Sequence, residues 1–339
     1  MALNILQINT ADTKGGAGKV AYWLQNELKK QGHNSTLLVA QKYSKDGDVK
    51  LIRPANNLRR RVLKKLTYYL ANDLGLFPSK HILKMPEFKN ADIVHCHNLH
   101  TNYFDLDMLE KISAIKPVVW TFHDMWPITA HCAHSFNGAL KKNGFFTCPG
   151  LDIYPPIAWH NEKYLEKTKA RIYKNSDFHI VTPSKWLADK VGQSILKIKP
   201  LSIIYNGIDI AIFRPYPREE TRRELGLPLD KKIILIVAKG GQANPWKGGN
   251  FAQDVIKEFT GDPQTLFVDL GGDTTQNSLQ LKTVSYVADR TTLAKYYSAA
   301  DILLYPSIAD NCPLVVLEAM ACGLKVVSFN TGGIPELVD

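Results

Sequence analysis

The sequence lacks any long apolar run. No stretch of its 339 residues approaches the roughly 18 apolar residues that a membrane-spanning helix needs, and runs such as residues 233–238 are typical of buried strands. The first residues also lack the basic, apolar and small-residue order of a secretion signal. A cytoplasmic protein is therefore expected, and the length predicts about two domains.

Cysteine is scarce and shows no regular spacing. The five cysteines, an odd number, are scattered over the chain: Cys96, Cys132, Cys148, Cys312 and Cys322. Secreted domains that depend on disulfides usually carry an even number of cysteines at regular spacing. Reduced thiols in a cytosol are therefore expected.

Acidic residues are absent between residues 49 and 72, although the whole chain has 32 of them. Apolar residues recur in this stretch near the helical period, so we predict a basic amphipathic helix. Such a helix is either a solvated face whose apolar side packs on the body, or a docking surface for anionic lipid. Nucleic acid is not an expected partner, because no recognition motif accompanies the charge. The basic residues proposed for docking are Arg59, Arg60, Arg61, Lys64 and Lys65.

Strand and helix patterns alternate along the chain, which predicts an α/β fold with parallel sheets. Three prolines and an Asn-Gly pair mark residues 200–217 as a connection between domains. We therefore predict two Rossmann-like, doubly wound domains, residues 1–200 and 201–339. The expected strands are residues 4–9, 35–40, 93–97, 118–122, 178–182, 233–238, 265–270, 301–305 and 325–329, and the expected helices include residues 20–30 and 159–174.

Residues that follow strands are candidates for a site, because ligands of parallel sheets bind beyond the carboxyl ends of the strands. Gly15 and Gly16 follow the first expected strand and open a helix, where N–H groups suit an anion. The alternative is a tight turn that needs glycine. His123 follows another strand, and it either bonds a sugar hydroxyl or is a structural histidine bonded to backbone.

Three more histidines, His95, His97 and His100, stand close together and resemble a metal cluster. We expect their alternating spacing to place the side chains on opposite faces of a strand. A metal site is therefore not predicted there.

The last thirty residues carry the most informative pattern. Asp310 and Glu318 stand eight positions apart across the predicted start of a helix, with Asp310 in the preceding loop. A helix N-terminus suits the diphosphate of a nucleotide. The flanking carboxylates can accept hydrogen bonds from ribose and sugar hydroxyls.

These motifs resemble glycosyltransferase family 4, whose members are retaining enzymes with the GT-B fold. The spacing of Asp310 and Glu318 resembles the family's pair of acids, and the sequences of residues 319–323 and 332–338 match as well. Residues 121–127, which include His123, and residues 206–209 fit further motifs of the family. The resemblance extends over nearly the whole chain.

The resemblance implies two Rossmann-like domains facing a cleft, and transfer of a sugar from a nucleotide diphosphate sugar with retention. The implied acceptor is a glycan or a polyprenyl-linked hydroxyl in cell-surface polysaccharide biosynthesis, met at the inner face of the membrane. No cofactor and no metal are implied. His123, Asp310 and Lys247 are implied to be catalytic. The implied donor-binding residues are Gly15, Gly16, Asn206, Lys247, Val287, Asp310, Leu314, Val315 and Glu318.

Several positions depart from the family's pattern. The arginine usual upstream of Lys247 is absent, and Lys239 is the nearest substitute. Asp310 stands where glutamate is more frequent. The family normally continues beyond the position of Asp339, so we expect an incomplete second domain with exposed apolar surface.

The loop between Cys132 and Cys148 also differs, because relatives usually carry a zinc-type set of cysteines there. Phe145 stands where one of them is expected. The two thiols could hold a metal together with His131 and His134, but a loop without its metal site is the better interpretation.

Two rival functions remain open from the sequence. An NAD-dependent oxidoreductase would also have two Rossmann-like domains. Against it, the glycine spacing is imperfect, and residues 40–42 lack the acid expected after the second strand. The other rival is a protein that binds a nucleotide sugar or a membrane without turnover.

Overall fold

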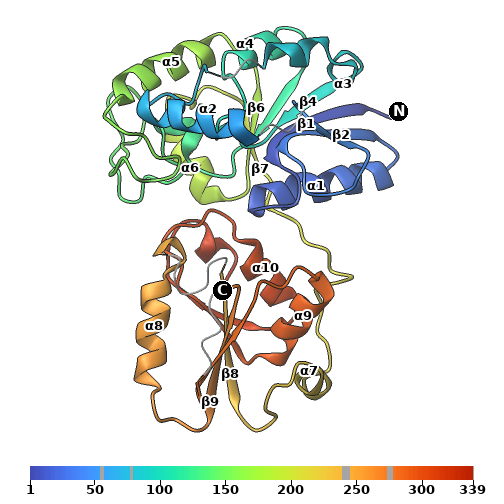
Figure 1. Ribbon diagram of the computed structural model, residues 1–339. Coiled ribbons are helices and arrows are strands. Elements are labelled where there is room, and N and C mark those ends of the chain that lie inside the picture. Colours follow the sequence, from blue (N-terminus) through green and yellow to red (C-terminus); the bar gives the residue numbers. More distant parts are fainter. Residues whose placement is uncertain (54–56, 77–78, 239–244, 273–277, 339) are drawn as a thin grey trace. The chain divides into compact units, whose positions relative to one another are not determined.

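The chain forms two compact units, Met1–Tyr205 and Asn206–Asp339 (Figure 1). The computed structural model describes residues 1–53, 57–76, 79–238, 245–272 and 278–338. Over these ranges, no helix combines the length and the apolar content needed to cross a bilayer. Each unit is built around one parallel sheet.

The sheet of the first unit has the strand order β3-β2-β1-β4-β5-β6-β7. Strands β1 and β4 are paired neighbours, although β2 and β3 separate them in the sequence. The loops that follow β1 and β4 therefore border the switch point of the sheet, where ligands of doubly wound folds bind. The strands are β1 (Asn4–Ala11), β2 (Asn34–Gln41), β3 (Val49–Leu51), β4 (Ile93–Cys96), β5 (Val118–Thr121), β6 (His179–Thr182) and β7 (Leu201–Ile203).

Helices cover this sheet, and apolar side chains of strands and helices share one core. Ile8 of β1, Val94 of β4 and Trp120 of β5 are buried there together with Leu165. The helices are α1 (Gly16–Lys30), α2 (Asn57–Tyr69), α3 (Pro86–Lys89), α4 (Met108–Ser113), α5 (Glu162–Lys174) and α6 (Lys185–Gln193).

The sheet of the second unit has the order β10-β9-β8-β11-β12. Its switch point lies between β8 and β11, so the loops that follow these two strands are where a ligand is expected. The strands are β8 (Lys232–Val237), β9 (Thr265–Leu270), β10 (Leu281–Val284), β11 (Ile302–Tyr305) and β12 (Lys325–Ser328). The helices are α7 (Arg218–Glu224), α8 (Gly249–Glu258), α9 (Arg290–Ala299) and α10 (Leu314–Ala321).

Every expected strand occurs, with ends that differ by at most a few residues. Three strands were not predicted: β3, β7 and β10. Each has only three or four residues with at most one buried side chain, so none shows a clear apolar run. Because β7 pairs with β6, residues 201–203 belong to the first sheet rather than to the connection.

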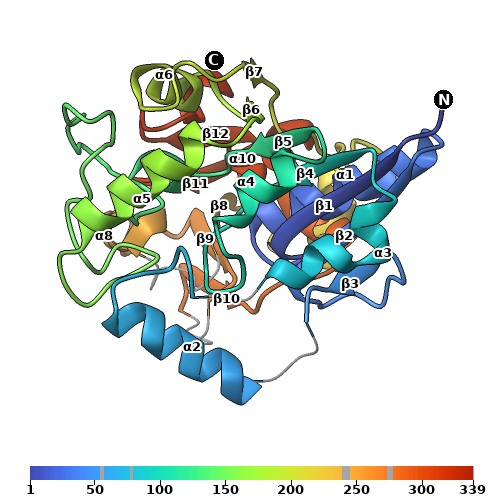
Figure 2. The ribbon, with the colours of Figure 1, turned by 90° about the horizontal axis from the view of Figure 1, so that it is seen from above.

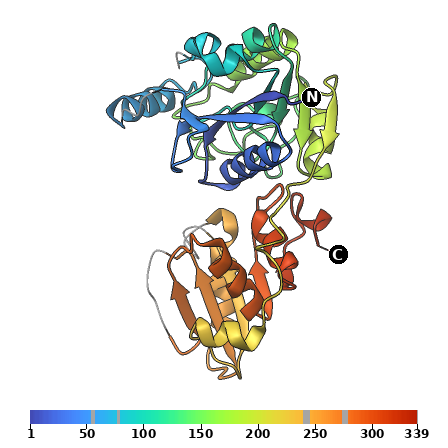
Figure 3. The same cartoon turned by 90° about the vertical axis from the view of Figure 1, so that its right-hand side faces the viewer.

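Helix α2 is the predicted basic helix, and it lies away from the strands at the outer side of the first unit (Figures 2 and 3). The alternative in which its apolar side packs on the body does not fit the structure. Leu58 is 73% exposed and Tyr69 is 66% exposed. The carboxyl end is held by Trp159, whose Nε1 donates to the Tyr69 carbonyl at 2.9 Å. The side chains of Arg59 and Arg60 lie outside the described residues.

A buried ion pair connects three elements of the second unit. The Arg222 guanidinium of α7 donates to Asp301 Oδ2 at 2.8 Å and to the Lys231 carbonyl at 3.0 Å. The same carboxylate oxygen accepts the N–H of Ile233 in β8 at 2.8 Å. Because Arg222 is only 5% exposed, this pair is shielded from solvent.

Arg222→Met should lower the free energy of unfolding of the second unit by about 3 kcal/mol, because it leaves the largely buried Asp301 carboxylate, 17% exposed, with fewer donors. This loss is at the low end of the range for breaking a buried ion pair, because Arg218 also donates to Asp301, at 2.9 Å. Urea unfolding measures the change. Arg223→Met is the matched control: Arg223 is 63% exposed beside Glu219, and it should change stability by less than about 1 kcal/mol. Equal effects of the two variants would contradict the role of the buried pair.

Candidate functional site

Lys247 and Asp310 meet at the switch point of the second sheet. Lys247 ends a short turn after β8, and Asp310 lies in the loop after β11. Their side chains form an ion pair. Asp310 Oδ2 also accepts hydrogen bonds from the hydroxyls of Tyr305, at 2.6 Å, and Ser307, at 2.9 Å. We call these four residues the Asp310 cluster. The structure thus brings two of the predicted catalytic residues together.

Tyr305 was missed by the sequence analysis, which treated it only as the end of a strand. Its side chain is 3% exposed. Burial, together with the neighbouring Asp310 carboxylate, raises the pKa of the Tyr305 hydroxyl well above its ordinary value. The hydroxyl therefore keeps its proton and donates to Asp310, while Lys247 Nζ donates to the Tyr305 oxygen at 3.1 Å. A tyrosine directly before the turn that carries the acid was the available signal.

Two glycines let the backbone pass close to the Asp310 cluster. Gly248 has φ +71°, and a Cβ there would overlap the carbonyl oxygen of Pro306. Gly332 has φ +59°, and a Cβ there would overlap the carbonyl oxygen of Asp310. The N–H of Gly333 then donates to that same carbonyl at 3.2 Å. The loop of residues 331–333 therefore holds the backbone of Asp310 in place.

Helix α10 begins directly after the loop that carries Asp310, with Leu314 and Val315 in its first turn. The first turn contains no acid and has no side-chain cap. Its N–H groups and the positive end of the helix dipole therefore suit an anion. Asn206 Nδ2 donates to the Cys312 carbonyl at 3.1 Å, which fixes the approach to the helix.

Glu318 lies one turn inside α10, as the sequence predicts. It is 2% exposed, and its Oε2 accepts the hydroxyl of Tyr297 in α9 at 3.0 Å. Val287, the expected contact for a base, lies between β10 and α9 and packs against the core of this unit. Lys239, the expected substitute for the missing arginine, lies outside the described residues.

The glycine loop of the first unit precedes α1. Gly15 has φ +75°, which favours glycine, whereas a Cβ at Gly16 would meet no atom within 4 Å. A Cβ at Gly18 would lie 3.0 Å from the Asp12 carbonyl oxygen, so the close packing of α1 also depends on glycine. The first turn of α1 has neither an acid nor a side-chain cap. The positive φ of Gly15 agrees with a tight turn that needs glycine, and the uncapped first turn of α1 also suits an anion. The two interpretations are therefore compatible.

His95 of β4 and His97, which directly follows this strand, lie together, so the expectation that they face opposite sides is wrong. The rings of His95 and His97 stack with centroids 4.3 Å apart, because residues two apart on a strand share a face. His97 Nδ1 is 3.0 Å from Nε2 of His123, which follows β5. In the described part of the chain, no three His, Cys, Asp or Glu side chains are grouped to hold a metal.

These three imidazoles share an environment that disfavours charge. Burial lowers the pKa of His95 to about 4, with a further contribution from His123. Burial also lowers the pKa of His123 to about 4, and it lowers that of His97 well below its ordinary value. All three rings are therefore neutral near pH 7.

Asp124 forms a second polar contact in the same loop. Its Oδ2 lies 2.9 Å from His100 Nε2, and its Oδ1 accepts the N–H of Trp126 at 2.9 Å. Burial raises the pKa of Asp124, but His100 and these hydrogen bonds outweigh it and leave the pKa below its ordinary value. Thr101 and Asn102, which follow His100, have φ of 77° and 68°. Such strained positions are frequent at functional sites.

Lys169 of α5 supports this loop from inside the core. It is fully buried, and its Nζ donates to the carbonyls of Trp126 at 2.6 Å and Thr129 at 3.1 Å. The ammonium lies 3.6 Å from the centroid of the Trp126 ring. Burial lowers the pKa of Lys169 to about 7. No motif in the sequence marked this lysine, because its partners are backbone atoms of a distant loop.

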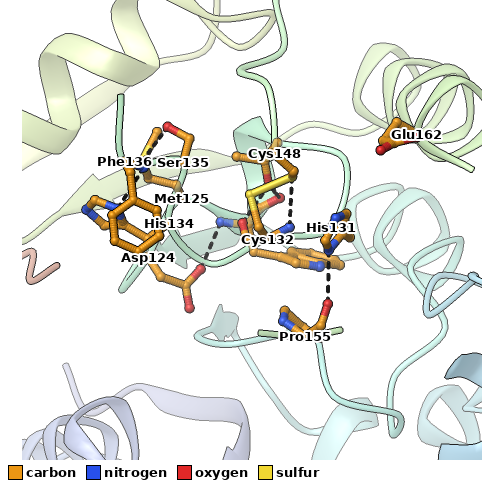
Figure 4. Close-up of a disulfide and its surroundings, with 12 residues drawn as sticks. Asp124, Met125, His131, Cys132, His134, Ser135, Phe136, Cys148, Pro155 and Glu162 are labelled. Atoms are coloured by element: carbon orange, nitrogen blue, oxygen red, sulfur yellow. Dashed lines mark hydrogen bonds between the residues drawn. A yellow bond between two sulfur atoms is a disulfide. The ribbon is translucent and has the colours of Figure 1, made fainter. Parts of the chain in front are cut away.

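Cys132 and Cys148 form a disulfide, so the expectation of reduced thiols is wrong for this pair (Figure 4). The two segments lie side by side because the Phe146 N–H donates to the Ile128 carbonyl at 2.9 Å. The Cα atoms of the cysteines are 5.9 Å apart, within the usual reach of a disulfide. The remaining cysteines are free and buried: Cys96, Cys312 and Cys322.

The two histidines of this loop have partners in the protein. His131 Nδ1 lies 3.0 Å from the Pro155 carbonyl oxygen, and His134 Nδ1 accepts the Phe136 N–H at 2.9 Å. Figure 4 shows His131 directed toward Pro155. With both sulfurs bonded to each other, the alternative of a Cys132–Cys148 metal site with these histidines does not fit the structure.

Among curated proteins, the putative colanic acid biosynthesis glycosyl transferase WcaC of Escherichia coli (strain K12) is 25% identical over an aligned length of 360, and the alignment covers 99% of this chain and 85% of that protein. The D-inositol 3-phosphate glycosyltransferase of Mycobacterium leprae (strain Br4923) is 29% identical over 241 residues, 65% of this chain and 52% of that protein. The match thus spans about half the length of the mycobacterial relative.

Solved structures show the same fold at low identity. The glycosyltransferase WaaG, described as involved in lipopolysaccharide biosynthesis, aligns with a TM-score of 0.63 at 14% identity, covering 98% of this chain and 82% of that one. Anabaena Alr3699/HepE in complex with UDP aligns with a TM-score of 0.61 at 16% identity, covering 99% and 83%. Two parallel sheets with this likeness establish the GT-B fold for the chain.

Matches to sequence families cover both units. Residues 14–212 match Glycosyltransferase Family 4, and residues 231–339 match Glycosyl transferases group 1. The first match alone extends over more than half of the 339 residues. It includes the glycine loop, the histidines of β4 and His123, while the second includes the Asp310 cluster and α10. The chain belongs to glycosyltransferase family 4.

Proposed function

We propose that this protein transfers a sugar from a nucleoside diphosphate sugar to a hydroxyl of a glycan or polyprenyl-linked acceptor, with retention, in cell-surface polysaccharide biosynthesis. The observation that carries the proposal is the Asp310 cluster beside the uncapped first turn of α10. A relative named for colanic acid biosynthesis and structural neighbours in complex with UDP and UDP-glucose support it.

The second unit offers a group for each part of the donor. The ammonium of Lys247 and the N–H groups of Leu314 and Val315 suit the diphosphate. Asp310 accepts hydrogen bonds from hydroxyls of the sugar, and Glu318 accepts hydrogen bonds from those of the ribose. The backbone at Val287 meets the base, and Asn206 holds the loop before α10. These cationic and amide groups stabilise the departing diphosphate without a metal.

Donor binding changes the partners inside the Asp310 cluster. Without donor, Lys247 and Asp310 neutralise each other. A bound diphosphate gives Lys247 an anionic partner, which weakens its pairing with Asp310. Tyr305 and Ser307 still donate to the carboxylate, so Asp310 stays oriented while it accepts a sugar hydroxyl.

Retention follows if the acceptor attacks from the face that the leaving group vacates. The bond between the anomeric carbon and the diphosphate oxygen breaks, and the bond to the acceptor oxygen forms on the same face. The acceptor proton moves to an oxygen of the leaving diphosphate, so no protein carboxylate is needed as nucleophile. In the first unit, His123 contacts the donor sugar, and Gly15 and Gly16 border the donor and acceptor.

Helix α2 is the proposed contact with an anionic membrane. Its exposed apolar side chains include Val62, 48% exposed, and Leu66, 46% exposed. Arg61, Lys64 and Lys65 are exposed on the same helix. A helix that presents apolar and basic side chains together, away from the sheet, has the chemistry of an interfacial helix. A polyprenyl-linked acceptor would be met at such a surface.

Glu318→Ala should weaken binding of UDP-glucose by about 1.5–3 kcal/mol, because hydrogen bonds from ribose hydroxyls to a charged acceptor are lost. Isothermal titration calorimetry measures the affinity, with the folded state checked by circular dichroism. Tyr297→Phe is the control, since it removes the hydroxyl bonded to Glu318 but keeps the carboxylate. An unchanged affinity in folded Glu318→Ala would exclude Glu318 from the donor site.

Lys247→Ala should lower kcat about 100-fold or more while changing the Kd of the donor less, because charge on the diphosphate grows as the glycosidic bond breaks. Lys257→Ala is the control, since Lys257 is 73% exposed on α8. Steady-state kinetics and calorimetry separate the two effects, and EDTA should leave the wild-type rate unchanged. A change in KM alone would make Lys247 a uniform binding contact. Loss of activity in EDTA with rescue by a divalent ion would contradict the metal-free assignment.

Replacing the five basic residues of α2 with glutamine should release the protein from vesicles of anionic phospholipid, since each contributes roughly 1 kcal/mol near the surface. Wild-type binding should fall as salt rises. Co-sedimentation measures binding, and donor affinity should stay unchanged. The replaced residues are Arg59, Arg60, Arg61, Lys64 and Lys65.

A control with the same change in charge uses five exposed lysines elsewhere in the first unit. It should sediment with vesicles like the wild type. If the α2 variant and the wild type sediment equally, α2 is a solvated face and no docking surface. The control lysines are Lys142, Lys163, Lys167, Lys174 and Lys197.

A further inference from the structure

The apolar side chains of α2 form one stripe along the exposed side of the helix. Leu58, Val62, Leu66 and Tyr69 follow each other at spacings of four, four and three residues, which places them on one side of a helix. All four are exposed, whereas Thr67, on the other side, is only 4% exposed. The stripe therefore points away from the body of the first unit.

The carboxyl end of α2 is held by a segment from a distant part of the sequence. Trp159 Nε1 donates to the Tyr69 carbonyl at 2.9 Å, and the Ala158 N–H donates to the Tyr68 carbonyl at 3.0 Å. The last carbonyls of a helix have no partner within the helix, so these two donors satisfy groups that the helix leaves open. Trp159 is thus fixed beside Tyr69, the last residue of the stripe.

The indole of Trp159 continues the exposed apolar surface beyond the helix. Trp159 is 49% exposed, although its N–H is bonded to the protein. Leu70, which directly follows α2, is also 49% exposed, and Tyr68 is 40% exposed. Aromatic side chains with an apolar body and a polar tip suit the boundary between a bilayer and water. We call Tyr68, Tyr69, Leu70 and Trp159 the apolar end of α2.

The charge beside the stripe indicates the kind of partner. Arg61 and Lys65 directly precede Val62 and Leu66, so they border the stripe, and both are exposed. No acid occurs between residues 49 and 72. Apolar side chains bordered by cations fit an anionic bilayer, because the headgroups attract the cations while the lipid takes up the apolar groups.

We propose that the apolar end of α2 enters the headgroup region of an anionic phospholipid bilayer, with Trp159 as an anchor outside the helix. The inference rests on the proposed membrane contact of α2 and extends it to a second segment of the chain. It also assigns the deepest contact to the carboxyl end of the helix, where the exposed aromatic side chains gather.

The same end of α2 is connected to the candidate site of the first unit. Asp73, four residues after α2, accepts a hydrogen bond from Trp126 Nε1 with its Oδ2 at 3.1 Å. The Trp126 N–H in turn donates to Asp124 Oδ1 at 2.9 Å, and Asp124 directly follows His123. A bilayer that holds Trp159 is therefore kept at a fixed position relative to the loop after β5. On the proposed function, a lipid-linked acceptor must reach this loop.

Quenching of tryptophan fluorescence by brominated phospholipid tests the position of Trp159 directly. Bromine near the headgroup end of the acyl chains quenches an indole that lies at this depth. The full chain is mixed with anionic vesicles that contain no polyprenyl lipid, and no donor or turnover is required. Brominated vesicles should quench the wild type more than the same vesicles without bromine, and this extra quenching should disappear in Trp159→Gln.

Trp159→Gln removes the ring but keeps an N–H donor for the Tyr69 carbonyl, at the same number of bonds from the backbone as indole Nε1. Its affinity for anionic vesicles, measured by co-sedimentation, should fall about fivefold to fiftyfold, because an aromatic ring no longer leaves water. Trp246→Gln is the matched control, since Trp246 is also exposed, 37%, but belongs to the second unit. This control should keep the extra quenching, and circular dichroism checks the fold of both variants.

The outcomes separate this inference from the proposed function. If the wild type sediments with the vesicles but Trp159→Gln keeps the extra quenching, Trp159 lies outside the bilayer, and the inference is overturned while contact through α2 stands. If the wild type does not sediment, the membrane contact of the proposed function is wrong, and this inference with it. Quenching at Trp159 in a protein without transferase activity would support the anchor and contradict only the proposed reaction.

Discussion

The candidate site of the second unit depends on the hydrogen bonds and the ion pair that converge on the Asp310 carboxylate. Its Oδ2 accepts hydrogen bonds from Lys247, Tyr305 and Ser307. Lys247 follows β8, whereas Tyr305 and Ser307 lie at and after the end of β11, and these two strands border the switch point. This convergence is possible because the backbone at Gly248 and Gly332 passes where any side chain would overlap a carbonyl oxygen. The close approach of these backbone segments thus sets the geometry of the site and positions its charged side chains.

The sequence was sufficient for the fold and for the residues that carry chemistry in a local motif. Apolar runs located the longer strands, and the spacing of Asp310 and Glu318 placed one acid in a loop and the other one turn into α10. The supporting residues could not be found in this way. Tyr305 resembles an ordinary strand residue, and Lys169 resembles an ordinary helix lysine. Their partners become apparent only when the chain is folded.

Three expectations differ from the structure: the faces of His95 and His97, the state of Cys132 and Cys148, and the packing of α2. His95 and His97 were separated by a wrong assignment of faces, although period two places them together. The pairing of Cys132 with Cys148 depends on a backbone contact between Ile128 and Phe146 that no local pattern announces. The apolar residues of α2 showed the correct helical period, but periodicity reports that a face is apolar and not what covers it.

The charge distribution supports a binding partner that brings its own negative charge. The first turns of α1 and α10, which follow loops at the switch points, contain no acid. Helices α5 and α7 carry glutamates in their first turns, whereas α6 and α8 share the absence of acids in the first turn. The histidines beside the first switch point are kept neutral by burial rather than charged. Because a neutral imidazole needs no counter-ion, these rings add no charge to the first switch point.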